Sequence, residues 1–145
     1  MIEDGDEYLE FASVFLRDWL LVSAKSGVQA LARMSEGGAD ALLIDLRFER
    51  ADEDALVGDL DATAARLFGG NRARALRHLQ DQQGTLILGQ LRAAGHAQPA
   101  LFVHPFPPRR LENLRRLYGA VDAVDTFDAA AIGRALRGAI ARRAP

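Results

Sequence analysis

Short apolar runs alternate with amphipathic segments along most of the chain. Runs typical of strands occur at residues 19–23, 41–45, 100–103 and 121–124. Apolar residues at helical spacing predict helices over residues 6–17, 27–34, 108–118 and 128–142. The runs at 41–44 and 100–103 are apolar throughout, as in parallel strands that are buried on both faces. The alternation predicts an α/β fold of three layers, in which a parallel sheet is covered by helices on both faces.

Two helical stripes of leucine occupy a segment that is too long for an ordinary crossover. A crossover between parallel strands needs about a dozen residues, and this segment runs from residue 49 to 95. The stripes predict mostly helical structure over residues 53–68 and 72–93, separated by Gly69-Gly70. Apolar stripes of this kind are expected to be buried against each other, the sheet or a second chain.

These helices form an insertion in a single domain. We expect the insertion at about residues 49–82 and one domain at 1–145, because no linker, repeat or low-complexity tract divides the chain. The insertion precedes the third crossover helix, which is the last part of the second stripe, kinked or divided at Gly84. One of its helices is expected to form a partner or dimer surface.

Composition narrows the class of protein. Apolar residues make up 49% of the chain and charged residues 26%, which is ordinary for a globular domain. The absence of cysteine excludes disulfides, thiolate catalysis and cysteine-ligated zinc, and the three histidines lack a metal-ligand spacing. No run approaches the roughly 18 apolar residues of a membrane helix, and the N-terminus is acidic, so we expect a cytoplasmic protein without a membrane segment.

Charge is placed unevenly along the chain. Residues 1–10 carry five carboxylates and no base, whereas residues 109–143 hold eight arginines against four acids. The arginines of the two C-terminal helices are expected to form one basic face, comprising Arg109, Arg110, Arg115, Arg116, Arg134 and Arg137. This face either steers an acidic protein partner or is the solvated side of amphipathic helices. The net charge of −2 and the scarcity of aromatic residues there argue against nucleic acid as a partner.

The order of elements and several short motifs resemble the receiver domains of bacterial response regulators. Glu3-Asp4 resembles the acidic pair that closes the first strand, and residues 41–45 resemble the third strand with its phosphorylated aspartate. Residues 99–103 resemble the fourth strand, and 119–124 the fifth with its preceding Gly-Ala. The resemblance covers most of the chain outside the insertion. It implies a flavodoxin-like parallel sheet of strand order 2-1-3-4-5.

The resemblance also implies a phosphoryl-transfer site. Asp45 would be the phospho-acceptor, and Glu3, Asp4 and Asp45 would lie side by side and hold Mg²⁺. In such receivers a hydroxyl at the end of the fourth strand binds a phosphoryl oxygen, and a lysine at the end of the fifth neutralises the charge.

Two positions depart from this pattern. His104 occupies the place of the hydroxyl, and the place of the lysine falls on Asp125 or Thr126. Lys25 is the only lysine and lies near the second strand, so no realignment restores the cation. The chain therefore resembles a divergent pseudo-receiver, which is not an enzyme and at most accepts a phosphoryl group.

Several of these residues also have purely structural interpretations. Asp4 and Glu7 have the D-x-x-E spacing of a capping box, which needs no metal. Arg47 lies two residues after Asp45, where it can form an ion pair with that carboxylate or supply the lost positive charge. His104 is interpreted as a hydrogen-bonded histidine at the rim of the site.

The first strand is short for a receiver. Only Met1 and Ile2 precede Glu3, although a central strand usually has about five residues. Either the sequence starts inside a longer protein or another segment completes the sheet.

The leading functional hypothesis is a non-catalytic receiver-like module of a bacterial two-component pathway or phosphorelay. It would bind a protein partner through helices 108–118 and 128–142 or through the 49–82 insertion, and a second copy of the chain is a further candidate partner. No cofactor is then needed. The alternative is a receiver that accepts a phosphoryl group on Asp45 with Mg²⁺ at the acidic pair.

Overall fold

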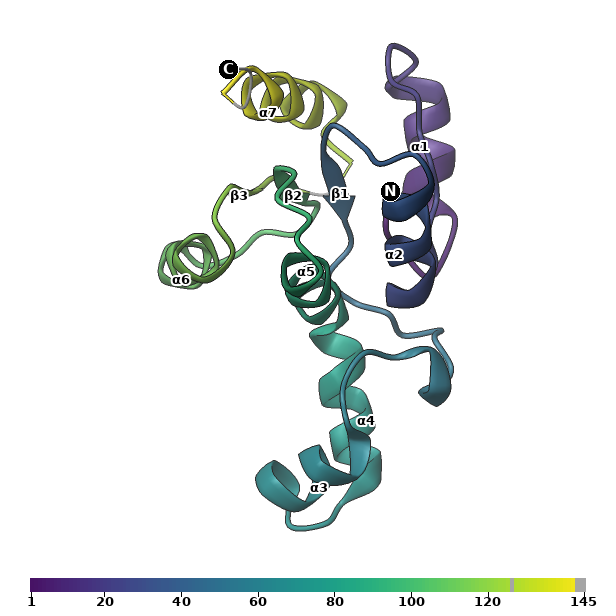
Figure 1. Cartoon of the computed structure of the whole chain (residues 1–145), viewed down its shortest axis with the longest axis vertical. Coiled ribbons are helices and arrows are strands. Elements are labelled where there is room, and N and C mark those ends of the chain that lie inside the picture. Colours follow the sequence, from purple (N-terminus) through teal and green to yellow (C-terminus); the bar gives the residue numbers. More distant parts are fainter. Residues whose placement is uncertain (126, 143–145) are drawn as a thin grey trace.

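A parallel sheet lies at the centre of the molecule. The computed structural model describes residues 1–125 and 127–142. Its three strands are Leu42–Ile44 (β1), Ala100–Phe102 (β2) and Val121–Ala123 (β3), in the spatial order β1-β2-β3. The register pairs Ile44 with Phe102, and Phe102 with Ala123. Figure 1 shows helices on both sides of these strands.

Ile2 extends the sheet beyond β1. It forms parallel bridges with Ile44 on one side and with Ala24 on the other. Its N–H donates to the carbonyl of Leu43 at 2.8 Å, and its carbonyl accepts from Asp45 at 2.9 Å. Across the sheet the segments are Ala24, Ile2, β1, β2 and β3, which is the order 2-1-3-4-5 when they are numbered along the chain. Ile2 itself therefore occupies the central place of the short first strand.

The predicted strand at residues 19–23 is wrong. These residues are not in a strand, although the carbonyl of Val22 accepts from the N-terminal ammonium of Met1 at 2.7 Å and the N–H of Ala24 donates to the carbonyl of Met1 at 2.9 Å. These contacts lie at the end of the run, and Leu20 is 95% exposed. An apolar run without a partner strand cannot form a sheet.

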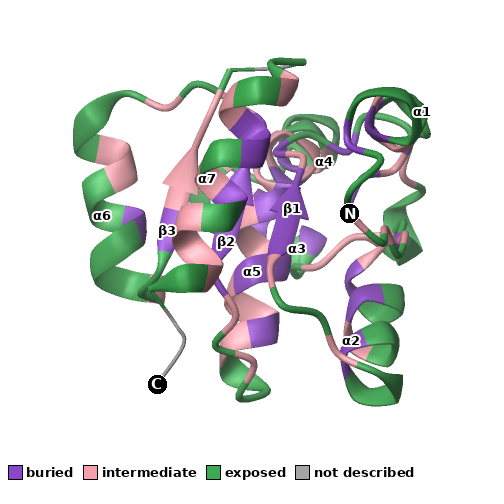
Figure 2. Cartoon of the chain, turned by 90° about the horizontal axis from the view of Figure 1, so that it is seen from above, coloured by how far each residue is buried: buried purple, intermediate pink, exposed green. Residues whose placement is uncertain are grey.

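Two clusters of apolar residues cover the two faces of the sheet. Leu42, Ile44 and Phe102 face Gly27–Glu36 (α2), Gln83–Ala93 (α5) and Pro108–Tyr118 (α6). Leu43, Leu101 and Val103 face Glu7–Phe15 (α1) and Ala129–Ala141 (α7). The alternation follows from the period of two in a strand. Figure 2 shows β1 and β2 as buried, whereas α1, α2 and α6 expose much of their surface. The helices on both faces of the sheet confirm the predicted three layers.

Local sequence positions most helix ends. Four helices begin after a residue whose side-chain oxygen accepts the backbone N–H of the third following residue. These capping residues are Ser26, Asp59, Asn71 and Asp128. Pro108 opens α6, where a missing N–H does no harm. Gly69 ends Leu60–Phe68 (α3) in the left-handed conformation that glycine adopts easily.

The insertion forms a hairpin of two helices. We call α3 and Arg72–Asp81 (α4), with the turn between them, the arm (residues 60–81). Its helices pack through their own cluster of Leu60, Ala64, Ala75 and Leu79. Figure 1 shows the arm projecting away from the sheet, at the end of the molecule opposite α7. A 3₁₀ turn, Glu53–Ala55 (η1), precedes the arm. With η1, α3, α4 and α5, the predicted segments 53–68 and 72–93 are mostly helical.

The long second helix divides at Gln82, and the following turn docks on the end of β1. The N–H of Gly84 donates to the carbonyl of Leu46 at 2.9 Å, outside its own helix. The buried amide of Gln83 accepts the N–H of Val57 at 2.6 Å and donates to its carbonyl at 3.1 Å. These contacts redirect α5 onto the sheet as the crossover helix. Within the described residues, no helix has both the length and the apolarity to cross a membrane.

Candidate functional site

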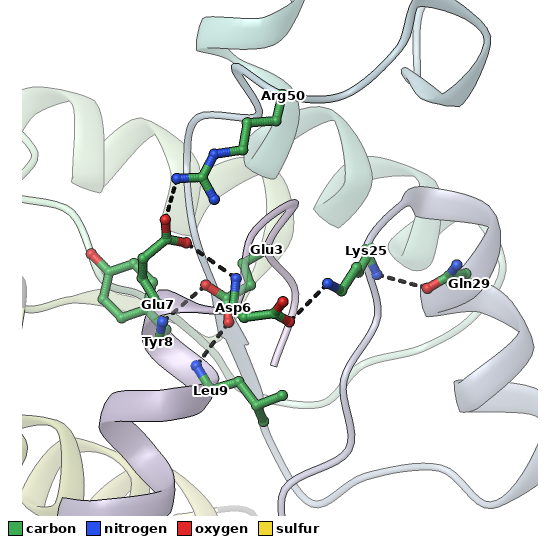
Figure 3. A network of polar contacts seen from close by, with 8 residues as sticks. All are labelled: Glu3, Asp6, Glu7, Tyr8, Leu9, Lys25, Gln29 and Arg50. Carbon is green, nitrogen blue, oxygen red and sulfur yellow. Dashed lines mark hydrogen bonds and ion pairs between the residues drawn. The ribbon is translucent and has the colours of Figure 1, made fainter.

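Glu3 ties the sheet to the first helix. Its side chain is 1% exposed, and its two carboxylate oxygens accept the N–H groups of Tyr8 at 3.0 Å and Leu9 at 2.8 Å (Figure 3). Burial raises the pKa of Glu3, although both N–H donors favour the ionised form. Glu3 thus caps α1 from outside the helix, so the predicted capping by Asp4 is wrong.

Asp4 and Glu7 both contact Arg50, which lies in the loop that follows β1. Asp4 accepts the backbone N–H of Arg50 at 2.6 Å. Glu7 forms an ion pair with the guanidinium group of Arg50, as Figure 3 shows. The hydrogen bond from Arg50 lowers the pKa of Glu7 to about 2. The other Glu7 oxygen accepts the N–H of the adjacent Asp6 at 3.1 Å and not that of Asp4, so the predicted capping box does not form.

Lys25 brings a second cation to the acidic residues. Its ammonium group lies 2.7 Å from the Asp6 carboxylate, and its backbone N–H donates to Gln29 at 2.9 Å. The hydrogen bond with Asp6 raises the pKa of Lys25, and Glu3 and Glu7 act in the same direction. The sequence alone did not predict this placement. It follows from the parallel bridge between Ala24 and Ile2, because Lys25 and Glu3 are the next residues on these two adjacent segments.

Asp45 follows β1 beside the acidic pair. Burial raises the pKa of Asp45 to about 6, and the negative charges of Asp4 and Glu3 add to this effect. The N–H groups of Leu46 and Arg47 act in the opposite direction. The structure therefore brings Glu3, Asp4 and Asp45 together, as the resemblance implies.

The predicted ion pair between Asp45 and Arg47 is wrong. No such pair occurs among the described residues, and Arg47 is exposed. The strand ends at Ile44, so the alternation that would align side chains two residues apart does not continue. Arg47 instead lies close enough to His104 to lower the pKa of that ring.

Asp45→Asn is expected to stabilise the protein above about pH 6 by roughly 1–2 kcal/mol. Because folding raises the pKa of this carboxyl, the folded state retains a proton that the unfolded chain releases between about pH 4 and 6. The free energy of unfolding therefore falls as pH rises through this window, and asparagine removes that loss. Urea unfolding at about pH 8 and pH 4 should show the gain only at the higher pH.

Asp40→Asn is the matched control, because Asp40 is an exposed aspartate shortly before β1. It should change stability little at either pH. Equal stability of wild type and Asp45→Asn at pH 8 would contradict the expectation.

His104 lies at the rim, directly after the buried Val103. Its ring meets Phe106 edge-on at 5.1 Å, and no hydrogen bond to it occurs within the described part of the chain. Burial lowers its pKa, with Arg47 and Arg110 contributing. The rim position is as predicted, whereas an aromatic contact replaces the predicted hydrogen bond.

Comparison with solved structures identifies the fold. No family model matches the sequence, and no curated protein matches it either. A response regulator receiver domain protein from Clostridium thermocellum superposes with a TM-score of 0.63 at 14% identity, over 98% of this chain and 92% of that one. The chain has the receiver-domain fold. The receiver domain of NtrX from Brucella abortus gives 0.59 at 15% identity, over 94% and 95%. The receiver domain of the Francisella response regulator 1452 gives 0.58 at 14%, over 99% and 95%.

The acids that the resemblance assigns to Mg²⁺ do not form a metal site as arranged. Both oxygens of Glu3 accept N–H groups, and one oxygen of Asp4 accepts from Arg50. The described residues contain no group of three or more histidine, aspartate or glutamate side chains arranged to hold a metal ion. A hard cation such as Mg²⁺ needs several oxygen ligands, so Glu3 in particular would have to share or give up its present partners.

The remaining predicted binding residues lie apart from the acids. Thr126 falls outside the described residues, and the neighbouring Asp125 is exposed. In the receiver fold, α6 carries the first four arginines of the predicted basic face, and three of them have partners. Arg110 lies 4.7 Å from the centre of the Phe106 ring, Arg115 pairs with Asp122 at 3.0 Å, and Arg116 lies 4.0 Å from Glu112.

The basic face is therefore smaller than its arginine count suggests. Arg110 also donates to Gln82, at the division between α4 and α5, and is half-buried. Arg109, Arg134 and Arg137 remain exposed and form no ion pair within the described residues.

Proposed function

We propose that this chain is a non-catalytic receiver-like module of a bacterial two-component-type pathway, acting in the cytoplasm by binding a protein partner. We take residues 1–145 as one domain with its insertion at about 49–82. One observation carries the proposal: the chain's own donors already satisfy the acids that would hold a metal. Glu3 accepts two backbone N–H groups, Asp4 accepts one, and Asp6 and Glu7 pair with Lys25 and Arg50.

Phosphorylation would conflict with this arrangement. An aspartyl phosphate adds nearly two negative charges, which need a metal and a fixed cation beside them. Lys25 and Arg50 are cations that contact the acidic residues near Asp45, and each is paired, with Asp6 and Glu7 respectively. Moving either cation to a phosphoryl group would leave an acid unpaired in an already negative cluster.

The alternative is a receiver that accepts a phosphoryl group on Asp45 with Mg²⁺ at Glu3 and Asp4. Two observations favour it. The three acids lie close enough to raise the pKa of Asp45. Lys25, directly after the bridged Ala24, supplies a cation beside the acids, whereas no lysine follows β3.

Acetyl phosphate with Mg²⁺ distinguishes the two hypotheses. We expect the intact mass of the wild-type chain to stay unchanged, because both oxygens of Glu3 accept N–H groups and Lys25 and Arg50 are paired with other acids. Asp45→Asn should keep the circular dichroism spectrum of the wild type and any partner binding. A phosphoryl mass increment that disappears in Asp45→Asn would put the alternative first.

The partner in this proposal is an acidic protein, which would bind α6 and α7 or the insertion; a second copy of the chain is also a candidate. The exposed Arg109, Arg134 and Arg137 support the first surface. Nucleic acid is disfavoured because few cations are unpaired there and the chain carries a net charge of −2.

A further inference from the structure

The arm carries a cavity of its own, far from the acidic cluster. Its volume is about 440 Å³, and it lies beside the start and outer face of α4. The side chains that give it chemical character are Phe68, Arg74, Arg77, His78 and Asp81. The arm has no counterpart in the motifs that carry the receiver resemblance, so the fold alone assigns it no role.

Helical spacing gathers these groups on one face. Arg74, Arg77, His78 and Asp81 follow the i, i+3, i+4, i+7 pattern on α4. Phe68, at the end of α3, lies against them: its ring centre is 5.6 Å from the Arg74 guanidinium and 5.5 Å from the His78 ring. The Phe68 ring thus lies directly beside the Arg74 guanidinium and the His78 ring. Leu67, the residue before Phe68, is 51% exposed.

Two arginines that line the cavity have no acidic partner within the described part of the chain. Arg72 pairs with Glu53 and Asp61, whereas Arg74 and Arg77 form no ion pair within the described residues. Residues 60–81 hold four arginines against two acids, although the whole chain has a net charge of −2. Asp81 is the only acid lining the cavity, one turn beyond Arg77. The arm is therefore a local positive region on a weakly negative protein.

We propose that this cavity binds an acidic peptide segment of a partner protein. Carboxylates of the segment would pair with Arg74 and Arg77, and a neighbouring apolar side chain would lie on Phe68 and Leu67. Guanidinium groups suit carboxylates because they donate in a planar fork. Only two arginines without an ion pair line the cavity among the described residues, too few for the run of phosphates along a nucleic-acid backbone, which is therefore a poorer match.

The inference rests on the proposed function and names the surface that the partner would use. The probe is a short synthetic peptide of alternating glutamate and leucine, titrated into the whole chain. The three histidines report its position by NMR, because His78 lines the cavity, whereas His96 and His104 do not. We expect the ring resonances of His78 alone to shift.

Charge reversal with a matched control completes the experiment. Arg74→Glu with Arg77→Glu should weaken peptide binding about tenfold or more. Arg17→Glu with Arg33→Glu makes the same charge change at exposed positions that do not line the cavity and should alter binding less than about twofold. Circular dichroism verifies that both variants fold.

Three outcomes would overturn the inference: no shift of His78, equal loss in both variants, or tighter binding of single-stranded oligo-dT with the same dependence on Arg74 and Arg77. Loss in an Arg109→Glu with Arg134→Glu variant, but not in Arg74→Glu with Arg77→Glu, would move the partner to α6 and α7 and leave the proposed function intact. Phosphorylation of Asp45 would defeat the proposed function without affecting these measurements.

Discussion

Gly84→Ala is expected to lower the free energy of unfolding by roughly 3 kcal/mol. A β-carbon at this position would lie 2.2 Å from the carbonyl oxygen of Asp45 and 3.0 Å from the α-carbon of Leu46. Both atoms belong to the backbone, so no side chain can rotate out of the way. Either α5 or the end of β1 must move, and the hydrogen bond from Gly84 to Leu46 is lost with that movement.

Urea unfolding followed by circular dichroism measures this effect, and its sign is informative. Alanine in a helix is otherwise favoured over glycine by up to about 1 kcal/mol, so a loss can only come from the contact. Gly37→Ala is the control, since an added β-carbon there would have no atom within 4 Å. A Gly84→Ala variant as stable as wild type would mean that α5 does not dock on β1 as described.

Glu3→Ala should cost about 2 kcal/mol at neutral pH. The change leaves the N–H groups of Tyr8 and Leu9 without their acceptor at the start of α1. Each unsatisfied buried donor costs about 1–3 kcal/mol, and relief from burying a carboxylate offsets part of that loss. Glu3→Gln keeps one acceptor oxygen, so its cost should be about half as large.

Amide exchange locates the effect of Glu3→Ala at the helix start. We expect the Tyr8 and Leu9 amides to lose protection selectively in this variant. Glu10→Ala, at an exposed acid in the same first part of α1, should change stability by less than about 0.5 kcal/mol. If Glu3→Ala were no more destabilising than Glu10→Ala, the capping role of Glu3 would be wrong.

Elements whose ends are encoded nearby are the ones that the sequence predicts well. The helix over 108–118 matches α6, because Pro108, the leucine stripe and Gly119 all lie within it or beside it. The strands at 41–45 and 100–103 contain β1 and β2, because runs buried on both faces are apolar throughout. In these cases the cause of the structure is local.

Most errors concern residues whose partners are distant in sequence; the expected pair of Asp45 and Arg47 fails for a local reason, because the strand ends at Ile44. The run at 19–23 fails as a strand because its contacts with the N-terminal segment begin only at Val22, and Leu20 is exposed. Arg50 reaches Glu7 from 43 positions away, and Asp4 accepts the Arg50 N–H across 46. No periodicity in a single sequence indicates such pairs. The sequence therefore indicates the candidate acids, but it does not indicate that Arg50 and Lys25 are their partners.

The hairpin of the arm bears on how quickly the sheet can assemble. Ile44 and Phe102 are adjacent in the sheet, yet the whole insertion and α5 separate them along the chain. Closing a loop of disordered residues becomes more costly in entropy as it lengthens, by about 0.6 kcal/mol for each doubling. The contacts of the arm are local, between α3 and α4, and local contacts form early in folding. Once the hairpin has formed, it acts as a short tether, so the added residues delay the pairing of β1 with β2 far less than their number implies.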